Sequence, residues 1–377
     1  MQIGVLRETL PGELRAAMTP ASAKKLIGKG IAIAIESGLG DASGYRDADY
    51  TAAGVTLKNR GALLRESNVV LRVRKPSLED VAALKAGSVH VSFLDPFNER
   101  SLVEAMAKQG VTAISMEMIP RTTRAQKMDA LSSQANLAGY VMVIQAAYHS
   151  PKIFPMMMTP AGTIAPARVF IIGAGVAGLQ AIATAKRLGA RVEAFDTRPV
   201  VAEQVRSLGA KFVEIDLGDV GQTAQGYAKE LTPEQIELQK QGQAKVIAQS
   251  DVVITTAQVF GRPAPRIVSR DMVEAMQPGS VVIDMAVESG GNVEGSVAGQ
   301  VVDINGVKVV GITNLPSEVA RNASDMYAAN LYNLLDEFWD KDKQNIDLDP
   351  ADDIVKGCLI TRDGQVVNTV IANHYAR

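Results

Sequence analysis

The stretch that decides the fold is Val169-Phe-Ile-Ile-Gly-Ala-Gly-Val-Ala-Gly178, an apolar run that leads directly into a Gly-x-Gly-x-x-Gly pattern. An alanine-rich segment follows, and a second apolar run at 191–195 then ends on Asp196. The glycine pattern alone is weak evidence. Here it lies between a predicted strand and a predicted helix, and the acid follows at the spacing of a βαβ unit. The sequence therefore predicts a Rossmann-type dinucleotide site.

Each part of the pattern has a physical role in such a site. Gly173 permits the tight turn, Gly175 lets the backbone approach a pyrophosphate, and Gly178 lets helix and strand pack closely. A helix that begins at Val176 would present free N–H groups and the positive end of its dipole to the phosphates. We therefore predict that these four residues contact the cofactor. The alternative is a glycine-rich turn without a ligand.

The end of the second strand bears on the choice between NAD and NADP. Asp196 can accept hydrogen bonds from both hydroxyls of an adenosine ribose, and it would repel a 2′-phosphate. At about 4 Å and an effective dielectric near 20, that repulsion reaches about 4 kcal/mol per unit charge. Arg198, two residues later, could instead hold a 2′-phosphate. Because the acid comes first, we predict NAD(H), with Asp196, Thr197 and Arg198 among its contacts.

Composition excludes several classes of function. The chain has 377 residues, 39 basic and 41 acidic, so its charge is nearly balanced, and only 5% of its residues are aromatic. Neither a nucleic-acid footprint nor a base-stacking surface is expected. The single cysteine, Cys358, excludes a disulfide framework. His90, His149 and His374 lack metal-ligand spacing, so no metal site is expected. The apolar runs are strand-sized, so we expect neither direct membrane insertion nor a secretory signal.

The order of strands and helices predicts an α/β fold with two Rossmann-like doubly wound parallel-sheet domains separated by a cleft. The N-terminal domain is expected to be discontinuous, formed by residues 1–139 and 312–377, and the NAD(H)-binding domain spans residues 140–311. A helix is expected at 136–154, core or interdomain packing at Met156-Met-Met158, and a type I′ hairpin at Asp363-Gly364. Thr256 and Ala257 follow a predicted strand, where open α/β sheets bind ligands, and are expected to contact the cofactor.

A long polar stretch, 218–230, has more glycine than a connection needs. Loops of this length in compact domains are usually functional or disordered. We predict a lid in which Gly226 and Tyr227 close over the nucleotide. The alternative is an inert surface loop.

Several motifs of the chain occur together in one protein superfamily. Arg7-Glu-Thr, Glu13-Leu-Arg15, the glycine fingerprint and Ile283-Asp-Met-Ala-Val-Glu288 resemble the alanine dehydrogenase and nicotinamide nucleotide transhydrogenase superfamily. Two segments are specific to one branch. Residues 116–140 are similar to the Arg-Gln-Asp loop of the transhydrogenase NAD(H)-binding component, and Gly226-Tyr-Ala-Lys-Glu resembles its mobile loop. The sequence is therefore identified as a member of the transhydrogenase branch.

The resemblance implies a site and a set of partners. Arg121 and Gln126 would fix the carboxamide and ring, Asp129 would orient Arg121 or the ring, and Ser132 would complete the catalytic set. The alternative is a solvated surface loop. The implied activity is an Si-specific NAD(P) transhydrogenase. Its cofactor is NAD(H), and its partners are an NADP(H)-binding subunit, membrane-spanning subunits and a second copy in a homodimer. It would be peripheral, at the cytoplasmic side of the bacterial inner membrane.

The sequence departs from alanine dehydrogenase where that enzyme binds and protonates its oxo-acid. Arg74 and Asp95 stand in the places of its lysine and histidine, although Lys75 is adjacent, and only Arg15 is kept. Reducing a carbonyl requires a positioned acid, whereas hydride transfer between two nicotinamides requires none. A stand-alone amino-acid dehydrogenase is one alternative function. The other is a module that senses NAD(H) without redox chemistry.

Overall fold

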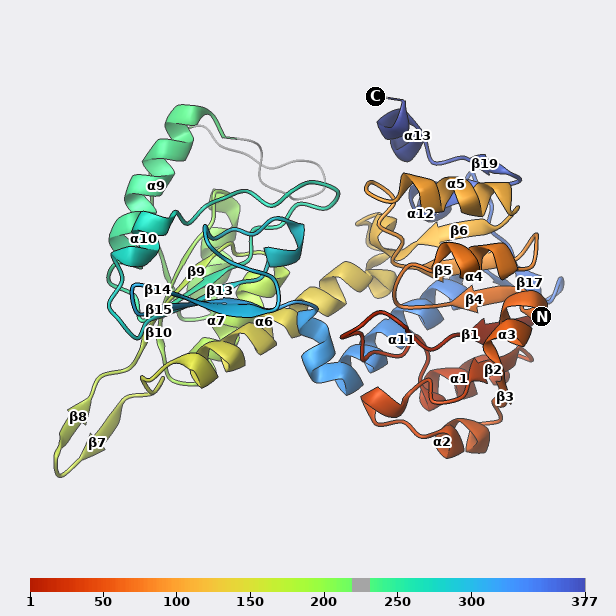
Figure 1. Ribbon diagram of the computed structural model, residues 1–377, viewed down its shortest axis with the longest axis horizontal. Helices are drawn as coiled ribbons and strands as arrows, with labels where there is room; N and C mark the ends of the chain where they lie inside the picture. The colour runs from red at the N-terminus through yellow and green to blue at the C-terminus, as the bar shows by residue number, and fades with distance from the viewer. Residues whose placement is uncertain (219–230, 377) are drawn as a thin grey trace. The chain divides into compact units, whose positions relative to one another are not determined.

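The computed structural model describes residues 1–218 and 231–376. The chain forms two compact units, Met1–Gln134 with Ser317–Arg377, and Ala135–Pro316. Each unit is built on a largely parallel sheet with flanking helices (Figure 1). The α/β class and the Rossmann-like sheets expected from the sequence are confirmed. The domain limits at 139/140 and 311/312 stay predictions, because a compact unit need not fold independently.

The first unit contains an eight-stranded sheet in the order β19-β18-β6-β5-β4-β1-β2-β3. Adjacent strands in the sheet are parallel from β6 across to β3. The direction in which the chain adds strands reverses between β4 and β1, as in a doubly wound sheet. The strands are β1 (Gln2–Val5), β2 (Ala32–Glu36), β3 (Thr56–Lys58), β4 (Val69–Leu71), β5 (Val89–Ser92), β6 (Thr112–Ser115), β18 (Leu359–Arg362) and β19 (Gln365–Val366).

Helices cover both faces of this sheet. One apolar cluster joins it to α1 (Pro20–Ile27) and α11 (Ala320–Glu337), and another joins it to α3 (Arg60–Glu66), α4 (Leu78–Ala83) and α5 (Arg100–Lys108). The unit also contains α2 (Asp47–Ala52), η1 (Asp41–Ser43), η2 (Met116–Met118), η3 (Gln126–Met128), α12 (Asp353–Cys358), α13 (Thr369–Tyr375) and a short pair, β16 (Trp339–Asp340) and β17 (Asn345–Ile346).

The C-terminal segment completes the first sheet. Strand β18 pairs antiparallel with β6, and β19 pairs with β18 through a two-residue turn. Asp363 and Gly364 have φ values of 50° and 80°, as the type I′ turn predicted from the sequence requires.

The second unit contains a seven-stranded sheet in the order β11-β10-β9-β12-β13-β15-β14. All neighbours are parallel except β14, an antiparallel edge strand that the sequence analysis missed. The strands are β9 (Arg168–Ile172), β10 (Arg191–Phe195), β11 (Lys211–Phe212), β12 (Val252–Thr255), β13 (Val281–Asp284), β14 (Gln300–Ile304) and β15 (Val307–Gly311). The helices are α7 (Val176–Arg187), η4 (Pro199–Val201), α8 (Ala202–Ser207), α9 (Pro233–Ile247), α10 (Arg270–Glu274) and η5 (Val287–Ser289).

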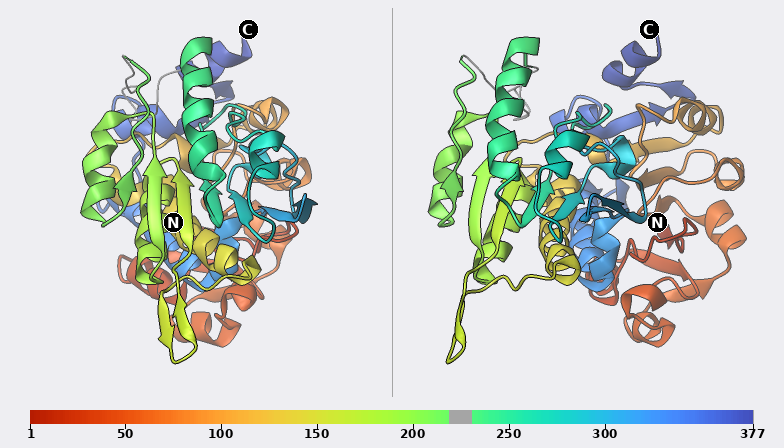
Figure 2. Two further views of the ribbon diagram at one scale, coloured as in Figure 1. Left: turned by 90° about the vertical axis from the view of Figure 1, so that its left-hand side faces the viewer. Right: turned by 60° about the vertical axis from the view of Figure 1, so that its left-hand side comes forward.

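A hairpin formed by β7 (Met157–Thr159) and β8 (Gly162–Ile164) extends away from the second sheet in every view (Figures 1 and 2). The side chains of Met156 and Met158 are 58% and 77% exposed. Packing of these methionines in a core is therefore wrong, and their packing between domains stays a prediction. The unbranched apolar side chains suggested a core, but the hairpin extends away from the sheet of its own unit (Figures 1 and 2).

Helix α6 (Ala130–His149) links the two compact units in sequence. The helix expected at 136–154 begins earlier, because Asp129 caps it, and ends earlier, two residues before Pro151. Within the second unit, α6 passes very close to α7 at Gly139. A Cβ atom there would lie 2.3 Å from the carbonyl oxygen of Ala177.

We expect Gly139→Ala to destabilise the second unit by about 1–3 kcal/mol, because the methyl group would push α6 away from α7. The measurement is the thermal unfolding of purified protein by scanning calorimetry. Gly61→Ala is the matched control: Gly61 is also helical, but its added methyl group meets only the flexible end of Arg65. Melting of Gly139→Ala at or above the temperature of Gly61→Ala would contradict the close packing.

Candidate functional site

The glycine turn after β9 is tightly packed at two of its three glycines. Gly173 has a φ of 98°, and a Cβ atom there would lie 2.4 Å from Oγ1 of Thr256. A Cβ atom at Gly178 would lie 1.9 Å from the carbonyl oxygen of Gly173. The Thr256 hydroxyl donates to the carbonyl oxygens of Ile172 and Gly173, at 3.3 and 3.0 Å. The turn, the start of α7 and the end of β12 therefore pack closely only if both positions are glycine.

Gly175 lies in a different environment. The nearest heavy atom to a Cβ built there is Nη2 of Arg198, at 4.0 Å. Among residues 1–218 and 231–376, no neighbouring atom therefore requires glycine here, and the space that these residues leave beside it is open. Gly175 is also the N-cap of α7, without a side-chain cap, so the first N–H groups of the helix keep their donor capacity. Open space beside uncapped donors is the arrangement that suits a phosphate group.

Asp196 is held by both the turn and its neighbour Arg198. The backbone N–H of Ala174 donates to Oδ2 at 2.7 Å, and the backbone N–H of Arg198 donates to Oδ1 at 2.9 Å. The guanidinium adds Nε to Oδ1 at 2.9 Å and Nη2 to Oδ2 at 2.8 Å. Its hydrogen bond with Asp196 raises the pKa of Arg198. The sequence analysis treated these residues as competitors, whereas in the structure they form a bidentate pair.

Thr256 and Ala257 lie where the strand order reverses, at the ends of the neighbouring strands β9 and β12. The backbone N–H of Ala257 donates to Oδ1 of Asn292 at 3.1 Å, and Nδ2 of Asn292 donates to the carbonyl oxygen of Ala257 at 2.8 Å. Asp284, fully buried, accepts from the backbone N–H of Asn292 at 3.1 Å. The sequence analysis missed Asn292, although it lies only four residues after the motif Ile283–Glu288.

The Arg-Gln-Asp loop lies in the first unit. Asp129 accepts from the backbone N–H of Ser132 at 2.9 Å and from its hydroxyl at 2.5 Å, and so caps α6. Arg121 and Gln126 are exposed. Among the described residues, the Gln126 side chain makes no hydrogen bond. The structure therefore brings Asp129 and Ser132 together and leaves the Gln126 amide available to a ligand.

The remaining predicted cofactor residues divide between the units and the undescribed segment. The glycine turn, Val176, Thr197 and the strand ends belong to the second unit. Gly226 and Tyr227 lie outside the described residues, and so does the lid predicted there.

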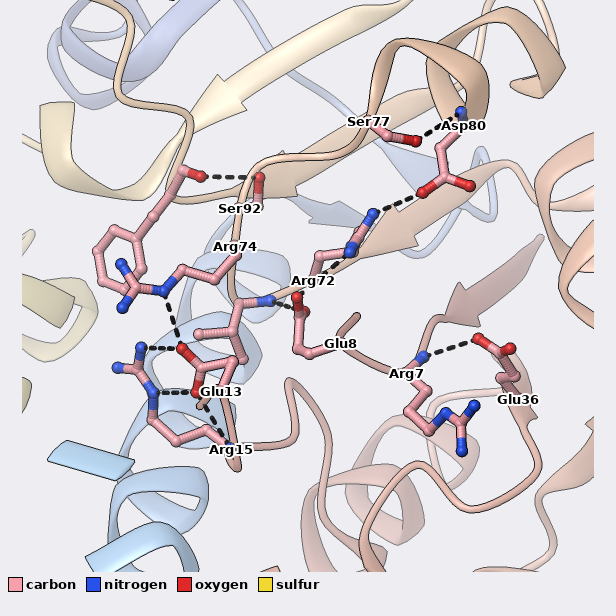
Figure 3. A network of polar contacts seen from close by, with 12 residues as sticks. Arg7, Glu8, Glu13, Arg15, Glu36, Arg72, Arg74, Ser77, Asp80 and Ser92 are labelled. Atoms are coloured by element: carbon pink, nitrogen blue, oxygen red, sulfur yellow. Dashed lines mark hydrogen bonds and ion pairs between the residues drawn. The ribbon is translucent and has the colours of Figure 1, made fainter. Parts of the chain in front are cut away.

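The first unit also contains a network of buried charges around Arg15 (Figure 3). Arg15, whose side chain is 3% exposed, donates to Glu13 through Nε at 2.7 Å and Nη2 at 2.6 Å. Arg74 also donates to Glu13, at 2.8 Å, and Nη1 of Arg15 donates to Gln134, at 2.9 Å. Burial alone would raise the pKa of Glu13, but Arg15 and Arg74 lower it to about 2. Glu13 therefore stays ionised near neutral pH and holds both arginines.

Lys75 and Asp95 pair with each other rather than forming an acid site of the alanine dehydrogenase kind. The Lys75 ammonium donates to Asp95 at 3.3 Å and to Glu99 at 2.5 Å. A carboxylate therefore lies where the alanine dehydrogenase resemblance implies an imidazole, and its lysine neighbour is neutralised by two acids.

In the part of the chain that the structure describes, acidic, histidine and cysteine side chains nowhere form a group able to hold a metal ion. No helix within residues 1–218 or 231–376 is long and apolar enough to span a membrane.

Comparisons with known proteins agree with the resemblance found in the sequence. The alanine dehydrogenase/PNT family matches through its N-terminal domain at residues 4–138 and its C-terminal domain at residues 142–369. The first part of the NAD(P) transhydrogenase subunit alpha of Rhodospirillum rubrum is 45% identical over 384 residues, covering 100% of both chains. The crystal structure of transhydrogenase from Sinorhizobium meliloti has a TM-score of 0.86 at 42% identity, covering 98% of this chain and 100% of that one.

A more distant relative is the alanine dehydrogenase of Halomonas elongata. It is 31% identical over 335 residues, covering 86% of this chain and 84% of that one. The similarity to both branches confirms the superfamily resemblance, and the full-length match confirms the preference for the transhydrogenase branch.

Proposed function

The chain belongs to the alanine dehydrogenase/PNT family, and we propose that it is the NAD(H)-binding component of a proton-translocating, Si-specific NAD(P) transhydrogenase. A separate subunit would hold NADP(H), and membrane-spanning subunits would couple hydride transfer to proton movement. The observation that carries the proposal is the full-length likeness to a transhydrogenase alpha subunit, in a chain whose glycine turn leaves open space at Gly175.

The proposed chemistry fits the side chains available. NADH gives a hydride from C4 of its ring to C4 of NADP⁺, so that NAD⁺ and NADPH form without the release or uptake of a proton. The protein must therefore place and orient the ring, because alignment of the reacting atoms dominates such a step. The exposed amide of Gln126 and the guanidinium of Arg121 would hold the ring and its carboxamide. Asp129 and Ser132 would fix the end of the loop by capping α6.

The pair formed by Asp196 and Arg198 supports a preference for NAD(H). Asp196 lies at the end of β10, where it can accept from ribose hydroxyls. Its two carboxylate oxygens also hold the Arg198 guanidinium, at 2.9 and 2.8 Å. The arginine is therefore paired with an acid instead of offering its full charge to a 2′-phosphate.

Alanine dehydrogenation is the alternative function, and the first unit supplies an argument against it. Arg15 and Arg74 are held by Glu13, and Lys75 is paired with two acids. An oxo-acid would have to compete with these carboxylates and would find no histidine to protonate it.

The proposed homodimer is supported by exposed apolar side chains in the second unit. Tyr140, Ile144 and Tyr148 follow one another at four-residue spacing on α6 and are 43%, 37% and 81% exposed. Met158, in the hairpin that follows α6 along the chain, is 77% exposed. Exposed apolar surface of this kind is typical of an interaction site. The transhydrogenase resemblance makes a second copy the expected occupant, in a complex peripheral to the cytoplasmic side of the inner membrane.

We expect the purified chain to sediment with the mass of two copies, and Met158→Asp with Tyr148→Asp to weaken the association because charges would enter an apolar interface. The measurement is sedimentation equilibrium at several concentrations. Val301→Asp is the control, since Val301 is exposed on strand β14, away from this segment in sequence. A single-copy mass at every concentration would refute the homodimer.

We expect NADH to bind at least about tenfold more tightly than NADPH, consistent with repulsion of a 2′-phosphate by Asp196. Asp196→Ala should narrow this difference, because it removes the repelling charge and releases Arg198. Calorimetric titration of both nucleotides measures the effect. Arg198→Ala in the same background should reverse the gain in NADPH affinity. Equal affinities in the unaltered protein would overturn the NAD(H) assignment.

We expect Gln126→Asn to slow single-turnover hydride transfer strongly, since a displacement of about 1 Å can cost about 10²-fold in rate. NADH affinity should change less than about tenfold, because the adenosine half supplies most of the binding. The assay mixes NADH-loaded protein with an NADP(H)-binding subunit that carries an NADP⁺ analogue.

The same assay tests the function itself. We expect the unaltered protein to transfer hydride to the NADP⁺ analogue. We expect it not to reduce NAD⁺ when L-alanine is supplied in place of the partner subunit. Alanine-dependent reduction would favour the dehydrogenase, and nucleotide binding without either reaction would favour a sensing module. If Gln126→Asn transfers at the normal rate, the loop is an ordinary solvated surface.

A further inference from the structure

Charged side chains tie the Arg-Gln-Asp loop to the C-terminal segment of the first unit. Nη2 of Arg124 donates to both carboxylate oxygens of Asp352, at 2.7 Å each, and also contacts Asp353. Nη1 of Arg124 lies 3.6 Å from Glu337, and the Lys127 ammonium lies 2.7 Å from the same side chain. Two cations of the loop thus meet three carboxylates that come from more than 200 positions further along the chain.

The same part of the loop is held through its backbone and its apolar side chains. Nδ2 of Asn330 and Nδ2 of Asn333 both donate to the carbonyl oxygen of Lys127, at 3.0 and 2.9 Å. Ala125 and Met128 are fully buried. The loop is therefore held in place at Ala125, Lys127 and Met128. Gln126 lies between these residues in the sequence, and its side chain is exposed.

Arg124 forms an ion pair with each of the three carboxylates. Burial would raise the pKa of Asp352, but its hydrogen bond with Arg124 lowers it, and the same hydrogen bond raises the pKa of Arg124. Without Arg124, Asp352 and Asp353 would repel each other beside a loop that has lost its tie to α12. A single exposed ion pair contributes little to global stability. Loss of Arg124 is therefore expected to change the position of the loop backbone rather than the global stability.

We propose that Arg124 is a positioning residue for hydride transfer, which holds Gln126 in place by clamping the loop to Glu337, Asp352 and Asp353. This inference rests on the proposed function. It assigns a role to the C-terminal segment, which supplies all three carboxylates of the clamp. Because the rate of such a transfer depends steeply on alignment, a small loop displacement would slow transfer while leaving the adenosine contacts unchanged.

The test compares Arg124→Ala with Lys343→Ala. Lys343 also binds two carboxylates on the surface of the C-terminal segment, Asp340 at 3.4 Å and Asp347 at 2.6 Å, and within the described residues no hydrogen bond or ion pair joins its side chain to the loop. We expect Arg124→Ala to slow single-turnover transfer at least about tenfold with NADH affinity nearly unchanged, and Lys343→Ala to do neither. Arg124→Lys should restore part of the rate, because lysine keeps the positive charge. It should not restore all of it, because one ammonium cannot bridge three carboxylates as a guanidinium does.

Asp352→Asn tests the clamp from its other side. Asp352 caps α12 by accepting from the backbone N–H of Ile354, and asparagine preserves such a cap while removing the charge. We expect slower transfer, and no further loss when Asp352→Asn is combined with Arg124→Ala. An unchanged rate in Arg124→Ala, or an equal loss in Lys343→Ala, would overturn the proposal.

Amide hydrogen exchange separates this proposal from the proposed function. Exchange at residues 122–129 should be faster in Arg124→Ala than in the unaltered protein, and unchanged in Lys343→Ala. If the unaltered protein transfers no hydride, the proposed function fails, and the exchange result alone decides whether the clamp exists. Unchanged exchange in Arg124→Ala would refute the clamp whatever the activity.

Discussion

The second unit depends on one close approach between backbone atoms. The carbonyl oxygen of Gly173 lies where a Cβ atom of residue 178 would otherwise be, at 1.9 Å, and Thr256 packs against the same turn. This contact fixes the start of α7 relative to β9 and β12. The N-cap of α7, Gly175, has no side-chain cap. Uncapped N–H groups at the start of a helix suit a bound anion, so this packing is what makes the proposed phosphate position possible.

Local sequence patterns predict most of the parallel strands, because these are short, apolar and separated by helices. They do not predict the parallel edge strand β3, which has no buried residue. The glycine turn and the hairpin at Asp363 and Gly364 were predictable because their signals are also local. The edge strand β14, the exposed hairpin methionines and the Asn292 contacts were not. Each depends on which segments are neighbours in the folded chain, and a local pattern carries no such information. The roles of the predicted site residues stay predictions.

Charged pairs show this limit most clearly. From the sequence, Asp196 and Arg198 suggested opposite nucleotide preferences, and in the structure the two side chains are paired with each other. Arg15 is the one residue kept from the oxo-acid site of alanine dehydrogenase, and Arg74 stands in the place of its lysine, yet Glu13 holds both arginines. The side chains of Arg15 and Glu13 are 3% and 0% exposed, so a ligand that took either one from its partner would leave an unpaired charge in the interior. Residue identity alone therefore overstates how many cations are available for binding.

The discontinuity of the first unit has a physical consequence for the candidate loop. Strand β6 leads into that loop, and its sheet neighbour β18 comes from near the end of the chain. Helix α11 supplies Asn330, Asn333 and Glu337 beneath the loop. Contacts between such distant segments require a long chain closure, which costs more entropy than local contacts do. The loop is thus held by side chains from the C-terminal segment, so the geometry of the candidate site depends on how that segment packs in the first unit.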